Sequence, residues 1–271
     1  MNSNEFYSLV KQQFPFQPTL KQDIVLQQLS EFIFSDKKND LYLLKGYAGT
    51  GKTSIIGAIV SNLWKAKKSA VLLAPTGRAA KVISNYSKKE AFTIHKKIYF
   101  PKKEKGGGVK FVIQPNKHKN TIFIVDEASM IPDSPSDSKF SDGSSLLDDL
   151  MSFVYSGHNC KLLLIGDTAQ LPPVKLDLSP ALNETTLELT YNKSVTKMEL
   201  DEVMRQEQDS GILVNATSLR EMLDKPFLDT FQFDLRGFKD IVRLTDGQEI
   251  MDAINDSYSD MGNEETAFSK K

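Results

Sequence analysis

The residues best suited to do chemistry form the stretch GYAGTGKT, which runs from Gly46 to Thr53. It fits the pattern G-x-x-x-x-G-K-[ST], in which the glycines let the backbone curl so that successive N–H groups point at one anion. In this pattern Lys52 would reach the β- and γ-phosphates of a nucleotide, and the Thr53 hydroxyl would ligate Mg²⁺. The stretch therefore predicts a site for ATP and Mg²⁺. Its expected cofactor-binding residues are Gly46, Ala48, Gly49, Thr50, Gly51, Lys52, Thr53 and Ser54.

The segments on either side supply the context that such a loop needs. Residues 41–44 are a short apolar run, which favours a buried parallel strand, and residues 54–60 favour a helix. A helix that begins at the loop adds the positive end of its dipole to the phosphate site. The alternative is a glycine turn that spells the pattern by chance, and the agreement of the loop with both flanking segments argues against it.

Two acidic residues follow another apolar run. Residues 121–125 favour a buried strand, and Asp126 and Glu127 come directly after it. Asp126 would hold Mg²⁺ through a water molecule, opposite Thr53, and Glu127 would orient or deprotonate the attacking water. An acidic pair in this position is common by chance, but together with the GYAGTGKT loop it indicates a metal-dependent nucleotide site.

Two further apolar strands are predicted to end in polar turns. Residues 161–166 are followed by Asp167 and Gln170, which could face a nucleotide at the edge of a sheet. Residues 70–74 lead into a turn with Thr76, whose hydroxyl and neighbouring helix N–H groups offer a site of phosphate size. Ordinary N-capping by Thr76 is the alternative, and these residues alone favour it.

Residues 99–119 differ in character from the rest of the chain. Two short runs of aromatic and β-branched residues flank a glycine-rich turn, which predicts a β-hairpin. Basic charge with interleaved aromatic rings is typical of a surface that binds a single nucleic-acid strand. A solvated hairpin whose lysines protect its edge explains these residues equally well. The lysines are Lys102, Lys103, Lys105, Lys110, Lys117 and Lys119, set against the single acid Glu104.

The remaining elements are predicted from periodicity and capping. Residues 5–34 favour two helices, of which the second can begin with Thr19 as its N-cap. Gln22 in its first turn could read an adenine edge with its amide, or could be a solvated helix residue, which is the simpler interpretation. Residues 186–190 favour a strand followed by a helical stretch, and residues 246–271 a last helix with a polar tail.

Composition limits the function classes that the chain can have. Its 271 residues are 40% hydrophobic and 25% charged, an ordinary globular profile. Because the formal net charge is −1, any binding of nucleic acid must come from a local groove. A single cysteine, Cys160, excludes a disulfide framework and a cysteine-rich metal site. Without a signal peptide or an apolar run of membrane-spanning length, we expect a cytoplasmic protein without membrane partners.

Taken together, the motifs resemble those of superfamily 1 DNA helicases of the RecD and Dda type, in their first motor domain. The string GDTAQLPPV over residues 166–174 is the most specific part of this resemblance. The ordered matches are Gln22, residues 46–53, 74–81, 93–95, 126–130 and 166–174, and finally Arg205 with Gln206.

This resemblance implies an α/β fold of the P-loop NTPase (RecA-like) class, a parallel sheet flanked by helices with an inserted β-hairpin. Residues 1–271 would form the motor domain, with residues 99–119 as a pin that splits the duplex. Residues 246–271 would lead to a second motor domain, because no further helicase motif follows Arg205. The resemblance thus implies a truncated half that hydrolyses ATP weakly by itself, a monomer whose partners are single-stranded DNA and that second domain.

The resemblance also implies roles for individual residues. Lys52, Glu127, Gln170 and Arg205 would be catalytic, Thr53 and Asp126 would hold the metal, and Gln22 would contact adenine. The implied DNA-binding residues are Pro75, Thr76, Arg78, His95, Phe100 and Phe111.

Two other classes of function remain as alternatives. A different P-loop ATPase, such as a nucleic-acid packaging motor, would not need the GDTAQLPPV string. A non-catalytic module would bind ATP or DNA without turnover, even with a second domain restored.

Overall fold

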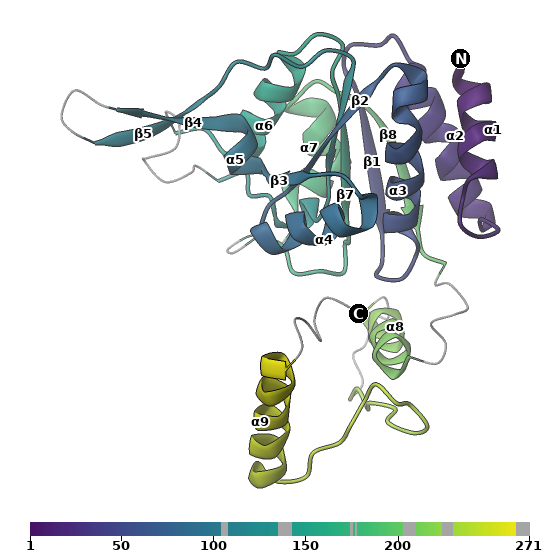
Figure 1. Cartoon of the computed structure of the whole chain (residues 1–271), viewed down its shortest axis with the longest axis vertical. Helices are drawn as coiled ribbons and strands as arrows, with labels where there is room; N and C mark the ends of the chain where they lie inside the picture. The colour runs from purple at the N-terminus through teal and green to yellow at the C-terminus, as the bar shows by residue number, and fades with distance from the viewer. Residues whose placement is uncertain are drawn as a thin grey trace. The chain divides into compact units, whose positions relative to one another are not determined.

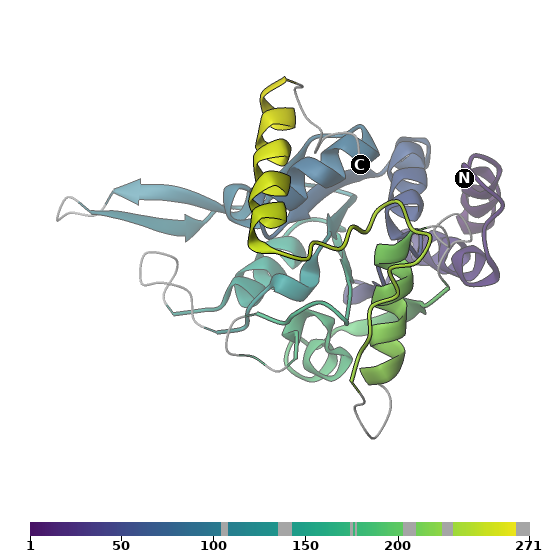
Figure 2. The same ribbon diagram turned by 90° about the horizontal axis from the view of Figure 1, so that it is seen from below.

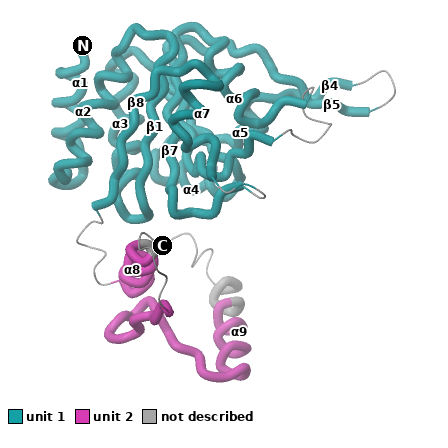
Figure 3. The backbone as a smooth tube through the Cα atoms, turned by 180° about the vertical axis from the view of Figure 1, so that it is seen from behind, with its two compact units in different colours: residues 1–204 teal, residues 205–271 magenta. Residues whose placement is uncertain are grey.

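The computed structural model describes residues 1–103, 108–134, 143–173, 176, 178–202, 210–223 and 230–263. The chain forms two compact units, residues 1–204 and residues 205–271 (Figure 3). The first unit contains the GYAGTGKT loop and both strands that end in acidic residues. The predicted catalytic Arg205 lies outside the described residues.

A six-stranded sheet forms the centre of the first unit (Figure 1), with the strand order β3-β2-β6-β7-β1-β8 and parallel pairing throughout. Because the strands run in the same direction, their carboxyl ends meet at one edge of the sheet. The segments that follow β1, β6 and β7, the strands at its centre, are therefore neighbours there. The strands are β1 (Asp40–Gly46), β2 (Ser69–Ala74), β3 (Ala91–Thr93), β6 (Thr121–Val125), β7 (Lys161–Gly166) and β8 (Ser194–Leu200).

Helices cover both faces of this sheet, and each face buries its own apolar cluster. Within β1, Tyr42 and Leu44 belong to one cluster and Leu41 and Leu43 to the other, as the alternation of side chains along a strand requires. One face is covered by α1 (Ser3–Gln12), α2 (Leu20–Phe34), α3 (Lys52–Asn62) and α4 (Gly77–Ser87), and the other by α5 (Ile94–Ile98), α6 (Leu146–Tyr155) and α7 (Glu184–Leu189). The predicted P-loop α/β fold is confirmed.

The predicted β-hairpin is present as a separate antiparallel pair that extends away from the sheet (Figure 2), formed by β4 (Tyr99–Lys103) and β5 (Val109–Ile113). Tyr99 is buried, and its hydroxyl donates a 2.5 Å hydrogen bond to the Asp149 carboxylate on α6. Phe111 packs against the cluster on the α6 side, whereas Phe100 is 40% exposed. The base of the hairpin is therefore anchored, and Phe100 presents a ring to solvent. Residues 104–107, which include Lys105 and Gly106, lie outside the described residues.

Two predictions near the end of the first unit are wrong. The segment predicted as a strand is α7, which begins after Asn183, whose side chain accepts a hydrogen bond from the Thr186 N–H. The helical stretch predicted after it is strand β8, which pairs with β1 over seven residues. Because β8 is a polar edge strand with residues such as Lys197 and Glu199, local pattern favours a helix, and only pairing with β1 makes it a strand.

The second unit contains α8 (Gly211–Leu223) and α9 (Gly247–Asn263). The Asp240 carboxylate accepts hydrogen bonds from the Gly211 and Ile212 N–H groups, and Asn215 exchanges hydrogen bonds with the Asp234 backbone. These contacts hold the segment after residue 230 against α8. The proposed motor domain over residues 1–271 and the link from residues 246–271 to a second domain remain predictions. None of the helices in the described ranges is long and apolar enough to cross a bilayer.

Candidate active site

The loop after β1 has the backbone conformation that its glycines allow. Gly49 and Gly51 have φ angles of 78° and 86°, in the left-handed region where side chains are strained. A Cβ atom at Gly51 would also overlap the Gln22 carboxamide, and one at Gly46 would lie 2.9 Å from the Leu200 carbonyl oxygen. Both glycines are therefore needed for this loop to pack against α2 and β8.

Gln22 lies beneath the loop rather than in solvent. It is 1% exposed, its Oε1 accepts a 3.1 Å hydrogen bond from the Thr19 N–H, and its Nε2 donates a 3.0 Å bond to the Thr50 carbonyl. The interpretation of Gln22 as a solvated helix residue is wrong, because the capping box of α2 and the loop engage both ends of its amide. Its contact with adenine remains a prediction.

Lys52 opens helix α3 and reaches back across the loop. Its ammonium group donates hydrogen bonds of 2.6 and 2.7 Å to the carbonyls of Gly46 and Tyr47. Thr53 and Ser54 follow in the first turn, where backbone N–H groups have no partner within a helix. A cation and free amide donors thus meet at one helix N-terminus, which is an arrangement that binds phosphate.

Asp126 and Glu127 lie at the same edge, after β6. Burial and the neighbouring Glu127 raise the pKa of Asp126 to about 6, and the charge of Lys52 partly opposes this rise. A divalent cation would favour the ionised carboxylate, so the site fits Mg²⁺. Glu127 has a φ angle of 56°, strained for a residue with a side chain, and its N–H donates a 3.0 Å hydrogen bond to the Asp126 carboxylate. The chain thus turns sharply at the predicted general base.

The turn after β7 is bonded to both other segments. The Asp167 carboxylate, which is 5% exposed, accepts hydrogen bonds from the Ala48 N–H at 3.2 Å and the Ala169 N–H at 2.8 Å. The Ser129 hydroxyl, two residues beyond Glu127, donates a 3.1 Å hydrogen bond to Gln170 Oε1. The sequence analysis gave Ser129 no role, although its place just after β6 at the shared edge was a signal.

The residues predicted to bind DNA lie on several elements at or beyond this edge. Thr76 caps α4 by accepting a 3.2 Å hydrogen bond from the Ala79 N–H, so the capping alternative applies. Pro75 is partly buried and Arg78 is exposed. His95 lies on α5, where burial lowers its pKa below the ordinary value and favours a neutral ring. Contact of DNA with these residues remains a prediction.

A family model described as an AAA domain matches residues 32–225. The chain belongs to this family. Among curated relatives, the ATP-dependent RecD2 DNA helicase of Deinococcus radiodurans is 29% identical over 180 residues, which are 66% of this chain and 21% of that protein. The ATP-dependent DNA helicase dda of Enterobacteria phage T4 is 31% identical over 190 residues, 65% of this chain and 37% of that protein. The predicted resemblance to helicases of the RecD and Dda type is confirmed.

The matched region of the chain thus spans only 21% of the length of the RecD2 helicase and 37% of the length of dda. Among solved structures, the Pif1 helicase from Candida albicans is similar with a TM-score of 0.48 and 21% identity, over 74% of this chain and 44% of that one.

Proposed function

We propose that this chain is the ATP-binding motor domain of a DNA helicase, which hydrolyses ATP to move along single-stranded DNA when it is joined to a second motor domain. The observation that carries the proposal is the meeting of three segments at one sheet edge. The GYAGTGKT loop bonds to Asp167, and Ser129, after Glu127, bonds to Gln170. The two relatives are both ATP-dependent DNA helicases, which supports the same activity for this chain.

Each of the residues at this edge has its own role in the proposed hydrolysis. The loop N–H groups bind the phosphates, while Lys52 leaves the carbonyls of Gly46 and Tyr47 to pair with the β- and γ-phosphates. Thr53 and Asp126 would hold Mg²⁺, which would supply positive charge to neutralise the phosphates. Glu127 accepts the proton of the water that attacks the γ-phosphorus, and ADP leaves.

Gln170 is oriented for a role at the γ-phosphate. Because its Oε1 accepts a hydrogen bond from the Ser129 hydroxyl, its Nε2 remains as a donor that would contact a γ-phosphate oxygen. Asp167 holds the same turn against the loop through the Ala48 N–H. A change at the phosphate would therefore move the turn, which couples ATP hydrolysis to the DNA surface formed by Thr76, His95 and the hairpin.

The decisive experiment measures ATP hydrolysis with and without a single-stranded oligonucleotide, for the parent chain and for Glu127→Gln. We expect the variant to bind Mg²⁺–ATP and to lose hydrolysis by at least about 100-fold, since the general base contributes about 10²–10⁴-fold. Glu188→Gln, the same change at an exposed residue of α7, is the matched control. Hydrolysis by Glu127→Gln at the parent rate would refute the assignment, and tight ATP binding without turnover even with a second motor domain restored would favour a non-catalytic module.

A further inference from the structure

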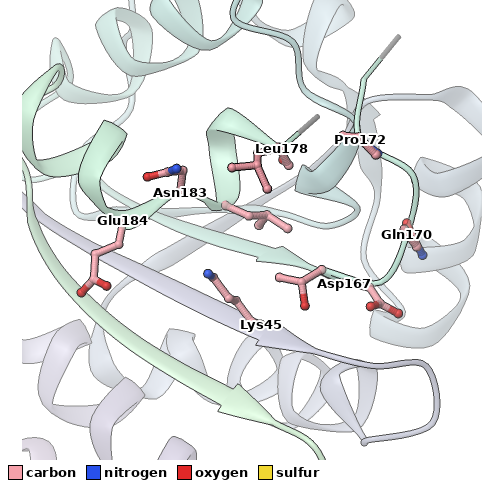
Figure 4. Close-up of a pocket in the computed structure, with 10 residues that line it drawn as sticks. Lys45, Asp167, Gln170, Pro172, Leu178, Asn183 and Glu184 are labelled. Atoms are coloured by element: carbon pink, nitrogen blue, oxygen red, sulfur yellow. The ribbon is translucent and has the colours of Figure 1, made fainter. Parts of the chain in front are cut away.

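A cavity of about 260 Å³ lies beside the turn that carries Gln170 (Figure 4). The Lys45 side chain extends into it from β1, and Asn183 and Glu184 face it from the start of α7. Leu178, which is 71% exposed, and Pro172 contribute apolar lining. The mechanism proposed above uses neither Lys45 nor Asn183.

Asp167 and Gln170 border both the cavity and the proposed nucleotide site, but Lys45 points to the face of the sheet opposite the helix that would hold the nucleotide phosphates. Side chains alternate along β1, and Leu41 and Leu43 point to the face covered by α6 and α7. Lys45 continues this series and points to the same face. Helix α3, whose N-terminus would hold the nucleotide phosphates, packs on the opposite face of the sheet. A nucleotide held by the loop therefore leaves Lys45 unused.

The two acids of the cavity are already paired. The Asp167 carboxylate accepts hydrogen bonds from two backbone N–H groups, and Glu184 forms an ion pair with Lys197 on β8. The Glu184 charge is thus balanced by a cation, whereas the Asp167 charge is stabilised by two neutral N–H donors.

Three donors that line the cavity have no acceptor in the part of the chain that the structure describes. The partly buried Lys45 ammonium forms neither a hydrogen bond nor an ion pair there. The Asn183 Oδ1 is used to cap α7, at 3.1 Å from the Thr186 nitrogen, which leaves Nδ2 as a donor. The Ser179 hydroxyl is buried without a hydrogen-bond partner. The buried Ser179 hydroxyl lacks a partner at a cost in free energy, and the partly buried Lys45 and Asn183 groups add two donors, so the cavity offers donors to the oxygens of an anion.

We propose that this cavity binds a backbone phosphate of single-stranded DNA, with Lys45 and Asn183 as its ligands. The inference rests on the proposed function, and it adds a phosphate contact on the turn that would sense ATP. The base of the hairpin and α5 pack in the apolar cluster on the face of the sheet to which Lys45 points, so a strand that contacts them would lie on that side of the sheet. Leu178 and Pro172 would contact the sugar beside that phosphate.

Salt dependence distinguishes a phosphate contact from a structural role. Binding of a fluorescein-labelled oligo(dT) is measured by anisotropy over a range of salt concentrations, for the parent, Lys45→Ala and the exposed control Lys38→Ala. We expect Lys45→Ala to weaken binding several-fold and to make the slope of log K against log[salt] shallower by about 0.7, the value for one phosphate contact on a single strand. The control should match the parent in both respects.

A second variant keeps the fold while it reverses the chemistry of the cavity. Asn183→Asp retains a good N-cap for α7 but replaces the Nδ2 donor with a negative charge. It should weaken oligo(dT) binding by at least as much as Lys45→Ala. Asn2→Asp makes the same change at the N-cap of α1 and should leave binding unaltered.

The outcomes separate this inference from the proposed function. If the parent binds oligo(dT) while Lys45→Ala and Asn183→Asp retain its affinity and salt slope, the cavity inference is wrong and the helicase proposal stands. If the parent binds neither oligo(dT) nor Mg²⁺–ATP, both are overturned. Weaker binding with an unchanged salt slope would mean that Lys45 supports the fold of the turn, which also overturns the phosphate contact.

Discussion

Buried or partly buried charged groups lie at both edges of the central sheet, but the two edges differ in whether these groups have partners within the chain. At the amino edge, Lys161 begins β7 and is 2% exposed, and its ammonium donates hydrogen bonds to the carbonyls of Phe32 at 2.6 Å and Ser35 at 2.5 Å. The Asp40 carboxylate lies 3.8 Å away. At the carboxyl edge, the pKa of Asp126 is raised to about 6, and Lys45 has no partner among the described residues.

This difference separates the charges that have partners within the chain from those that a bound ligand would pair. At the amino edge, groups of the chain itself offset part of the cost of removing an ion from water, although burial still lowers the pKa of Lys161. At the carboxyl edge a bound anion and cation would offset this cost. Cavity size does not make this distinction, because the cavity beside Lys161 measures about 460 Å³ and the one beside Lys45 only about 260 Å³. The two cavities are distinguished by whether the charged groups that line them have partners within the chain.

The largest expected effect is at the carboxyl edge. Lys52→Ala should lower ATP affinity by about 100-fold, because a charged hydrogen bond to phosphate contributes up to about 3 kcal/mol. The melting temperature without nucleotide should change little, since the Lys52 ammonium donates hydrogen bonds to loop carbonyls and the side chain belongs to neither apolar cluster. Calorimetric titration measures the affinity, and an unchanged affinity would contradict the proposed difference between the two edges.

The matching change at the amino edge should have the opposite signature. Lys161→Met leaves the carbonyls of Phe32 and Ser35 without their donor, so the free energy of unfolding should fall by about 2 kcal/mol. ATP affinity at saturating Mg²⁺ should be that of the parent. Denaturant unfolding and the same titration test this, and a loss of affinity without loss of stability would contradict the structural role.

A smaller effect is expected where two segments of the carboxyl edge are bonded to each other. Ser129→Ala removes the donor that orients Gln170, which should reduce kcat for ATP hydrolysis by up to about tenfold, the value of one neutral hydrogen bond. KM should change little, because Ser129 itself would not touch the nucleotide. Steady-state kinetics separate the two constants. A change confined to KM would instead place Gln170 in ground-state binding.

The smallest effect concerns pH. Burial lowers the pKa of Lys161 to about 8, against about 10.4 in an unfolded chain. Between these values the unfolded state binds more protons, so stability rises with pH; below pH 8 both states are protonated and the cost of the buried charge is constant. We expect the parent to gain about 1 kcal/mol between pH 8 and 9 relative to Lys161→Met. Parallel unfolding curves for the two proteins would show that Lys161 does not titrate in this range.

The catalytic edge was predictable from sequence because its signals are local. The GYAGTGKT loop and the acidic pair after an apolar strand each lie within a few residues, so their spacing indicates strand, turn and helix without knowledge of distant partners. The hairpin was predictable for the same reason, since its two strands are neighbours in the chain. The parallel sheet followed from strands that alternate with helices.

Other features depend on residues that are far apart in the chain. Strand β8 exists because it pairs with β1, and Gln22 is buried because the loop 28 residues later lies over it. The bond from Ser129 to Gln170 crosses between two strands, and the pairing of each lysine depends on which face or edge of the sheet it reaches. Sequence alone determined which groups could bind a nucleotide. Only tertiary packing decided which charges are paired within the chain, because their partners come from segments that no local pattern connects.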